Sequence, residues 1–105
     1  MSYENIVKMM EEFGVPFAYD HFAEGESPAP PFLCFLLPGE EAFGADNIVY
    51  TSFQELNVEL YTDTKDPDLE KRLEEVLTQH ELFYEKSEVW IPEEKLYEVL
   101  YELVL

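Results

Sequence analysis

The sequence predicts an α+β fold, a mainly antiparallel sheet with two helices packed on one face. Two stretches, residues 3–13 and 67–80, place apolar residues at helical spacing, and six others are rich in the apolar and aromatic residues that form strands. The strand–helix–strand alternation that builds parallel sheets does not run through the chain. With 105 residues, 47% of them hydrophobic, the chain can build one core, so we expect a single domain over residues 1–105.

The first helix is expected at residues 3–13, with Gly14 placed to end it. Its apolar side is formed by Tyr3, Ile6, Val7, Met10 and Phe13. A short strand is then expected at residues 17–22, "FAYDHF". The Pro-, Gly- and Ser-rich residues 23–31 predict a loop, and residues 32–37, "FLCFLL", predict a buried strand.

Residues 38–47, "PGEEAFGADN", contain two glycines and predict a second loop. Two further strands are expected at residues 48–53 and 55–62. The second of these alternates, because Leu56, Val58 and Leu60 share one face and Asn57, Glu59 and Tyr61 share the other. We therefore expect a strand with one face open to solvent.

Four acidic residues, Asp63, Asp66, Asp68 and Glu70, lie close together where the chain enters the second helix. A calcium loop is one interpretation, but Lys65 interrupts the ligand pattern and no glycine is present. Asp66 before Pro67 is instead a typical helix start, and carboxylates in a first turn are favoured by the helix dipole. We expect a helix start and no specific metal site.

The C-terminal residues predict two strands around a turn at residues 92–94, with a C-terminal helix as the competing interpretation because good helix formers are present. As a strand, the last segment alternates with period two. Glu98 and Glu102 then lie on the face opposite Tyr97 and Tyr101.

The charge of the chain limits its partners. Six basic residues against 24 acidic ones leave a formal charge of −18, which repels nucleic-acid phosphates and anionic membranes. No apolar run is long enough to span a membrane and the N-terminus lacks the pattern of a signal peptide, so a cytosolic protein is expected. The one cysteine, Cys34, lies in an apolar run and is expected to be a buried, inert thiol.

Catalytic motifs are missing from the sequence. Cys34, His21 and His80 are the candidates for nucleophilic chemistry, and none belongs to a recognisable motif. Asp20 and His21 are strand neighbours that should point to opposite faces, and His80 should contact the last carbonyls of its helix. We expect no enzyme, no catalytic residues and no cofactor.

The residues most suited to contact other proteins lie in the loop at residues 38–47 and on the open faces of the predicted strands. The loop is either a simple connection or a docking segment for a partner. The candidate interface residues are Glu40, Glu41, Phe43, Asp46, Glu59, Tyr61, Glu98 and Glu102.

Several stretches resemble the small tail-assembly proteins of tailed phages and prophages of Gram-positive bacteria: "VPFAYDHF", "SPAPPF", "NVELYTDTKDPDLEKRLEEVL" and "SEVWIPEEKLYEVLYE". The resemblance runs through most of the chain and rests on overall pattern, with tail terminators and head-tail joining proteins as its nearest members. It implies a structural subunit that forms a hexameric ring on the tail tube end and meets the tail tube protein and the head connector protein. Such a protein would occur in the host cytoplasm during assembly and then in the virion.

A second function class remains open. So acidic a chain could be a DNA mimic, an inhibitor or adaptor that occupies the basic cleft of a host protein. A ring subunit needs contact patches on two different sides, whereas a mimic needs one continuous acidic surface.

Overall fold

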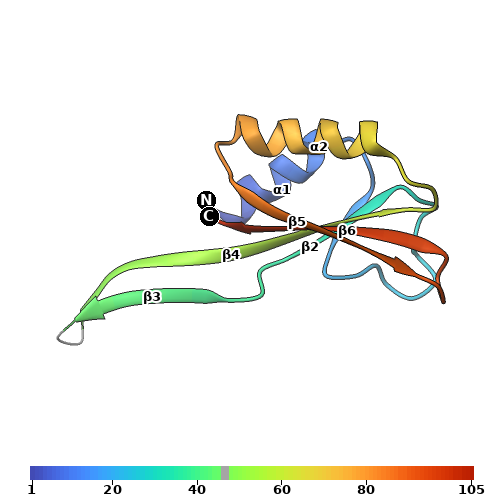
Figure 1. The fold of residues 1–105 in the computed structure, drawn as a ribbon. Helices are drawn as coiled ribbons and strands as arrows, with labels where there is room; N and C mark the ends of the chain where they lie inside the picture. The colour runs from blue at the N-terminus through green and yellow to red at the C-terminus, as the bar shows by residue number, and fades with distance from the viewer. Residues whose placement is uncertain (46–47) are drawn as a thin grey trace.

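A computed structural model describes residues 1–45 and 48–105, and all side chains among them except those of residues 43, 45 and 48–51. The described residues form two helices and six strands (Figure 1). These are α1 (Tyr3–Glu12), β1 (Phe17–Tyr19), β2 (Phe32–Leu36), β3 (Glu40–Ala45), β4 (Ile48–Thr62), α2 (Pro67–Gln79), β5 (Tyr84–Ile91) and β6 (Leu96–Val104).

The strands form one sheet in the order β1-β2-β4-β6-β5, with β3 paired to β4 outside this path. Only the β1–β2 pair is parallel, and the other pairs are antiparallel. Both helices lie on the same face of the sheet (Figure 1). The predicted α+β fold, with a mainly antiparallel sheet and two helices on one face, is confirmed.

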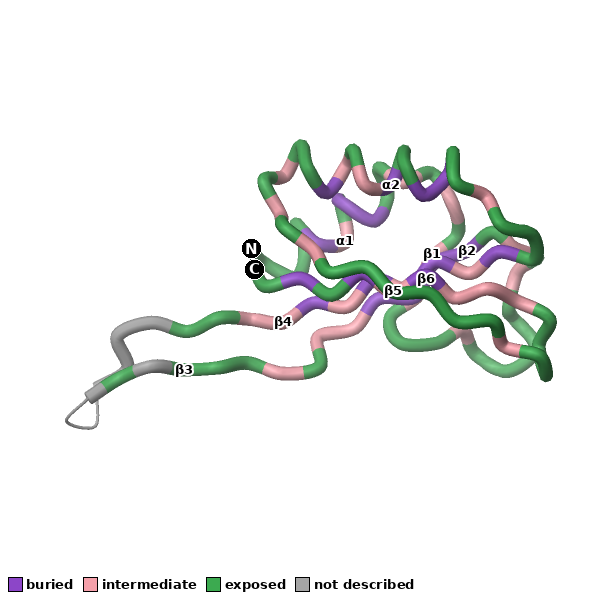
Figure 2. The backbone as a smooth tube through the Cα atoms, in the orientation of Figure 1, coloured by how far each residue is buried: buried purple, intermediate pink, exposed green. Residues whose placement is uncertain are grey.

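The core lies between the helices and the sheet (Figure 2). The predicted alternation of β4 is confirmed, because Leu56, Val58 and Leu60 are all buried against the helices. The last segment is a strand and not a helix, since β6 pairs with both β4 and β5 along its length. The core residues are Ile6, Met9, Met10, Leu33, Phe35, Leu56, Val58, Leu60, Leu69, Leu73, Leu77, Val99, Tyr101 and Leu103.

The prediction for residues 38–62 was wrong in two respects. The segment expected to be a loop contains β3, and the two expected strands are a single strand, β4, of 15 residues. β3 and the first half of β4 pair with each other and extend away from the domain as a two-stranded hairpin (Figures 1 and 2). The molecule is consequently elongated, measuring 51 × 30 × 24 Å along its principal axes.

The strand expected at residues 17–22 was predicted too long. β1 ends at Tyr19 because Asp20 has a φ of 62°, a left-handed conformation that interrupts extended backbone. Because of this turn, the side chains of Asp20 and His21 do not point to opposite faces, as was expected for neighbours in a strand. His21 Nδ1 lies 3.0 Å from Asp20 Oδ2, so the two neighbours contact each other.

The acidic cluster before α2 includes a helix cap, as predicted. The Asp66 side chain accepts a hydrogen bond of 3.1 Å from the backbone N–H of Leu69, and Pro67 occupies the first turn. Within residues 1–45 and 48–105, no group of three or more His, Cys, Asp and Glu side chains is placed to hold a metal ion. None of the helices described there is long and apolar enough to cross a membrane.

Replacing the cap should therefore weaken α2. We expect Asp66→Ala to lower the free energy of unfolding by about 0.5–1 kcal/mol, because the N–H of Leu69 loses its acceptor. Urea denaturation followed by circular dichroism measures the change. Asp66→Asn keeps a side-chain oxygen at the same place and should stay close to the original protein, and equal losses in both variants would contradict the capping role.

Candidate assembly surface

The hairpin that leaves the domain, called the arm below, comprises β3 and residues 48–54 of β4. Its strands pair from Glu40 opposite Gln54 to Ala45 opposite Ile48, with an irregularity between Phe43 and Gly44. None of the core residues found in the described chain belongs to it. Backbone pairing thus holds the two strands of the arm to each other, and none of the arm's described side chains belongs to the hydrophobic core.

The arm is anchored at its base. The backbone N–H of Glu55 donates to the carbonyl of Gly39 over 2.9 Å, and Gln54 Nε2 donates to the same carbonyl over 2.7 Å. The N–H of Leu105 donates to the carbonyl of Gln54, which ties the C-terminus to the same place. These bonds lie at Gln54 and Glu55, where the arm leaves the domain.

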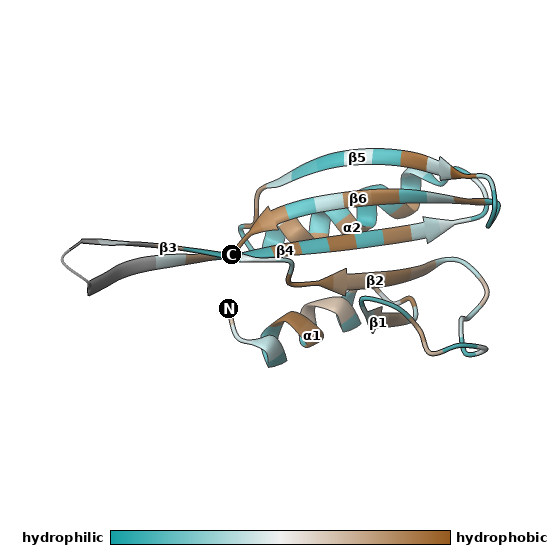
Figure 3. Cartoon of the chain, turned by 90° about the horizontal axis from the view of Figure 1, so that it is seen from below, coloured by the Kyte–Doolittle hydropathy of each residue, from teal (hydrophilic) through white to brown (hydrophobic). Residues whose placement is uncertain are grey.

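The sheet face opposite the helices, called the open face below, is the second candidate surface. Figure 3 is viewed towards this face, and hydrophilic and hydrophobic residues alternate along β4, β5 and β6. Tyr61 lies opposite Glu98 in the β4–β6 register, and Glu59 lies opposite Leu100, so the two glutamates are diagonal neighbours. Two carboxyl groups therefore meet at the centre of this face.

This arrangement changes the acidity of Glu59. Burial and the negative charge of Glu98, which also shares a hydrogen bond with it, raise the pKa of Glu59 to about 7. The Tyr61 hydroxyl, which donates to Glu59, acts in the opposite direction. Near neutral pH the Glu59 carboxyl is therefore partly protonated, a consequence of its burial beside another carboxylate.

The predicted interface residues fall into two groups. Glu40 and Glu41 are exposed on the arm, whereas Glu59, Tyr61, Glu98 and Glu102 lie on the open face. Asp46 and the Phe43 side chain lie outside the described residues. The structure thus brings together the four residues of β4 and β6 and separates them from those of the arm.

The loop at residues 20–31 covers part of the open face, which the sequence did not indicate. Phe22 from this loop packs edge-on against Phe32, with ring centroids 5.4 Å apart. Cys34, on the same face, is 5% exposed, so the predicted burial is confirmed. Burial and the nearby charge of Glu59 raise the pKa of the Cys34 thiol to about 11, which leaves it protonated and unreactive.

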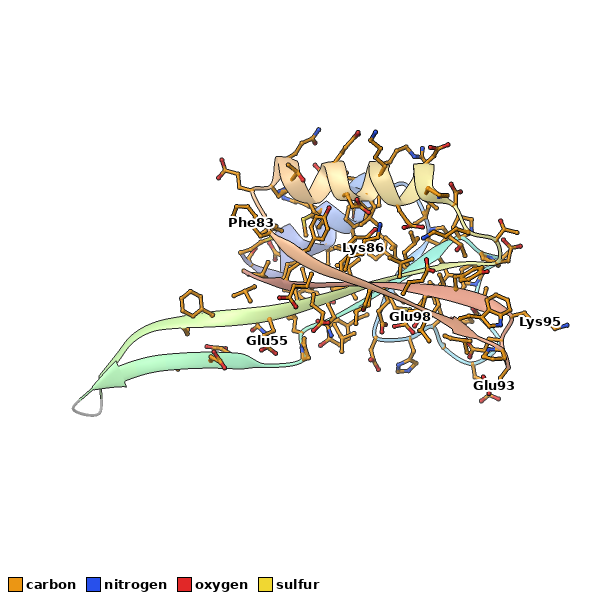
Figure 4. All side chains as sticks on the ribbon, viewed as in Figure 1. Glu55, Phe83, Lys86, Glu93, Lys95 and Glu98 are labelled. Atoms are coloured by element: carbon orange, nitrogen blue, oxygen red, sulfur yellow. The ribbon has the colours of Figure 1, made fainter. Side chains whose placement is uncertain are left out.

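A network of ion pairs joins α2 to the sheet. Glu70 is 3% exposed, with Lys65 Nζ at 2.6 Å from one carboxylate oxygen and Lys86 Nζ at 2.8 Å from the other. Lys86 also contacts Glu74 at 2.7 Å, and the buried Tyr101 hydroxyl donates to the same Glu74 oxygen. Figure 4 places Lys86 in the layer between α2 and the sheet.

Glu70 and His80 have partners that the sequence did not suggest. Glu70 was expected only as a first-turn carboxylate, and its two lysines come from outside the helix. The His80 side chain was expected to contact the last helix carbonyls, but His80 Nε2 lies 2.6 Å from a carboxylate oxygen of Glu12. That contact links the ends of α2 and α1.

A hollow of about 700 Å³ lies where the arm meets the domain. Among its lining residues Phe83 is 92% exposed and Val104 is 55% exposed. Pro38 and Glu55 line it from the arm side, and Figure 4 shows Glu55 and Phe83 on this side of the molecule. Large apolar side chains so exposed are typical of contact surfaces.

The fold and these surfaces define a class, a small acidic α+β domain that carries an extended arm. The chain matches no known family model and no curated protein.

Proposed function

We propose that the chain is a non-enzymatic structural subunit of phage tail assembly, a tail terminator or head-tail joining protein that forms a hexameric ring. The arm is the observation that carries the proposal. An isolated two-stranded hairpin is marginally stable in water, so an arm that extends from the domain and adds no described residue to its core would gain stability by lying on another molecule. The sequence stretches that resemble phage tail-assembly proteins support tail assembly as the process in which the chain takes part.

A ring also needs a surface that receives the arm. In a head-to-tail contact, one patch of each subunit meets a different patch of the next, and a closed rotation then gives a ring. The hollow that contains Phe83 and Val104 provides exposed apolar surface at the base of the arm, away from its tip. The chain thus has two dissimilar contact surfaces, as a ring subunit requires.

The charge of the chain opposes this assembly. Each copy carries a formal −18, and ions screen such repulsion only over about 10 Å at 0.1 M salt. Divalent cations or basic partner proteins would offset it. The tail tube protein and the head connector protein are the partners that the proposed role supplies.

Shortening the arm tests the proposal. Residues 41–53 are replaced by Asn-Gly, which closes a two-residue hairpin turn next to the Glu40–Gln54 pair. We expect the full chain to form a hexamer that is strengthened by millimolar magnesium, and the shortened chain to remain monomeric with an unchanged core. Light scattering after size exclusion gives the mass, and circular dichroism checks the fold.

Two further variants make the test sharper. Phe83→Ser alters the receiving hollow and should weaken the hexamer, whereas Glu75→Gln on the outer side of α2 should leave it intact. A shortened chain that still forms hexamers would show that the arm is not the assembly device. A full chain that stays monomeric with magnesium and captures a nucleic-acid enzyme would favour the DNA mimic.

A further inference from the structure

A cavity of about 460 Å³ opens on the open face beneath the loop at residues 20–31. It lies between this loop and the turn that joins β5 to β6. The lining residues are Asp20, His21, Phe22, Ser27, Pro28, Pro30, Phe32, Cys34, Tyr61, Asp63, Glu94, Lys95 and Leu96. Its size falls within the range of pockets that hold small organic groups.

Three aromatic rings form one wall of the cavity. Phe32 and Tyr61 are stacked, with ring centroids 5.1 Å apart and planes 23° from parallel. Phe22 meets Phe32 at an angle of 89°. Faces of aromatic rings attract cations, and the planar guanidinium group of arginine also stacks on them.

Three carboxylates lie among the other residues that line the cavity. Asp20, Asp63 and Glu94 line the cavity from three separate segments, and the Glu59–Glu98 pair lies on the adjoining part of the face. Two groups counter this charge in part. His21 contacts Asp20, and Lys95 also lines the cavity, although Figure 4 shows the Lys95 side chain directed away from the molecule.

Burial is the largest cause of the raised pKa of Glu59, and the negative charges nearby add to it. Asp20 contributes to that shift along with Glu98, so the carboxylates of the cavity and the pair influence each other. A bound cation would stabilise the ionised carboxylates of both.

We propose that this cavity binds an arginine side chain of a partner protein. The aromatic wall would stack on the guanidinium plane, and the carboxylates of Asp20 and Asp63 would accept its hydrogen bonds. Another copy of this chain is a poor source, because its one arginine, Arg72, belongs neither to the arm nor to the hollow through which copies are proposed to meet. The inference rests on the proposed function, since it specifies how a tail or head protein would be recognised.

Nuclear magnetic resonance of the ¹⁵N-labelled full chain tests the cavity directly. Nα-acetyl-arginine amide is titrated, with the uncharged Nα-acetyl-citrulline amide as the matched ligand. We expect saturable shifts confined to the parts of the chain that line the cavity, which are residues 20–32, Cys34, Tyr61, Asp63 and residues 94–96, at about millimolar concentration, with arginine only. Equal shifts with citrulline, or none with arginine, would overturn the proposal.

Variants separate the cavity from the general acidity of the chain. Asp20→Asn keeps a residue that tolerates the left-handed backbone there. Asp20→Asn and Asp63→Asn, each made singly, should lower the affinity about fivefold to tenfold. Glu102→Gln removes the same charge elsewhere on the open face and should have little effect. Equal losses in all three variants, or much tighter binding of spermidine than of arginine, would count against a site for a protein side chain.

The titration does not depend on ring formation. A chain that binds arginine but never assembles would contradict the ring and keep the cavity. A chain that assembles but does not bind arginine would contradict the arginine site and keep the ring.

Discussion

Lys86→Met should lower the free energy of unfolding by about 2 kcal/mol at pH 7. Removing one partner of a fully buried ion pair typically costs about 3–5 kcal/mol, because the other charge stays buried and unpaired. The Lys86 side chain is 37% exposed, so water compensates for part of this loss. Met preserves the apolar stem of the side chain and isolates the effect of the charge.

The loss should depend on pH. Burial alone would raise the pKa of Glu70, but hydrogen bonds from Lys65 and Lys86 more than offset it, and the pKa is lowered. The pKa of Glu74 is lowered in the same way by Lys86 and Tyr101, against the effect of burial. Stability from these carboxylates is therefore present above their ordinary pKa near 4.5 and is lost as the pH falls below it.

Thermal and urea denaturation between pH 3 and pH 8 measure this dependence. The difference between the original protein and Lys86→Met should be largest above pH 5 and should shrink towards pH 3. Lys71→Met, on the exposed side of α2, serves as the control and should change stability by less than about 0.5 kcal/mol. A pH-independent difference would mean that Lys86 acts through packing and not through its charge.

The ion network shows where sequence reasoning reached its limit. Helical spacing correctly placed Leu69, Leu73 and Leu77 on the buried side of α2. It could not show that Glu70 is also buried, because its partners Lys65 and Lys86 come from outside the helix. Apolar periodicity shows which side of a helix is buried, whereas the burial of a charged side chain depends on contacts with segments that are distant in the sequence.

The arm was missed for a related reason. The glycines and the acidic residues in residues 38–47 are typical of loops, and local turn chemistry predicts a loop there. A strand forms nevertheless because the β-rich residues of β4 provide a pairing edge for β3. Whether a segment forms a strand depends on the strand with which it pairs, so residues 38–47 alone could not predict β3.

The open face was predictable in part. Period-two alternation placed Glu59 and Tyr61 on one face of their strand, and Glu98 and Glu102 on one face of theirs. The register of β4 and β6 shows that all four lie on the same face of the sheet. The cavity beneath the loop at residues 20–31 was not predictable, because it depends on how a Pro-rich loop folds back over the sheet. The aromatic residues Phe22 and Phe32 were the features of the sequence that could have indicated a cavity there.

Glu59→Gln should stabilise the protein by about 1–2 kcal/mol at pH 8 and have little effect at pH 5. Below pH 4.5, Glu59 is protonated in both the folded and the unfolded chain. Between 4.5 and about 7 the unfolded chain releases this proton while the folded chain retains it, so stability falls as the pH rises. A shift of this size would give about 3 kcal/mol for an isolated group, and coupling to Glu98 and solvent screening reduce it.

Glutamine reproduces the protonated form of Glu59 without its ability to ionise. Its amide N–H₂ can donate to Glu98, and its carbonyl oxygen can accept from Tyr61. Urea denaturation at pH 5, 6, 7 and 8 should give a stability that falls less steeply with pH in Glu59→Gln than in the original protein. Glu102→Gln, exposed on the same face, should retain the original slope, and parallel slopes in all three proteins would mean that Glu59 and Glu98 do not share a proton.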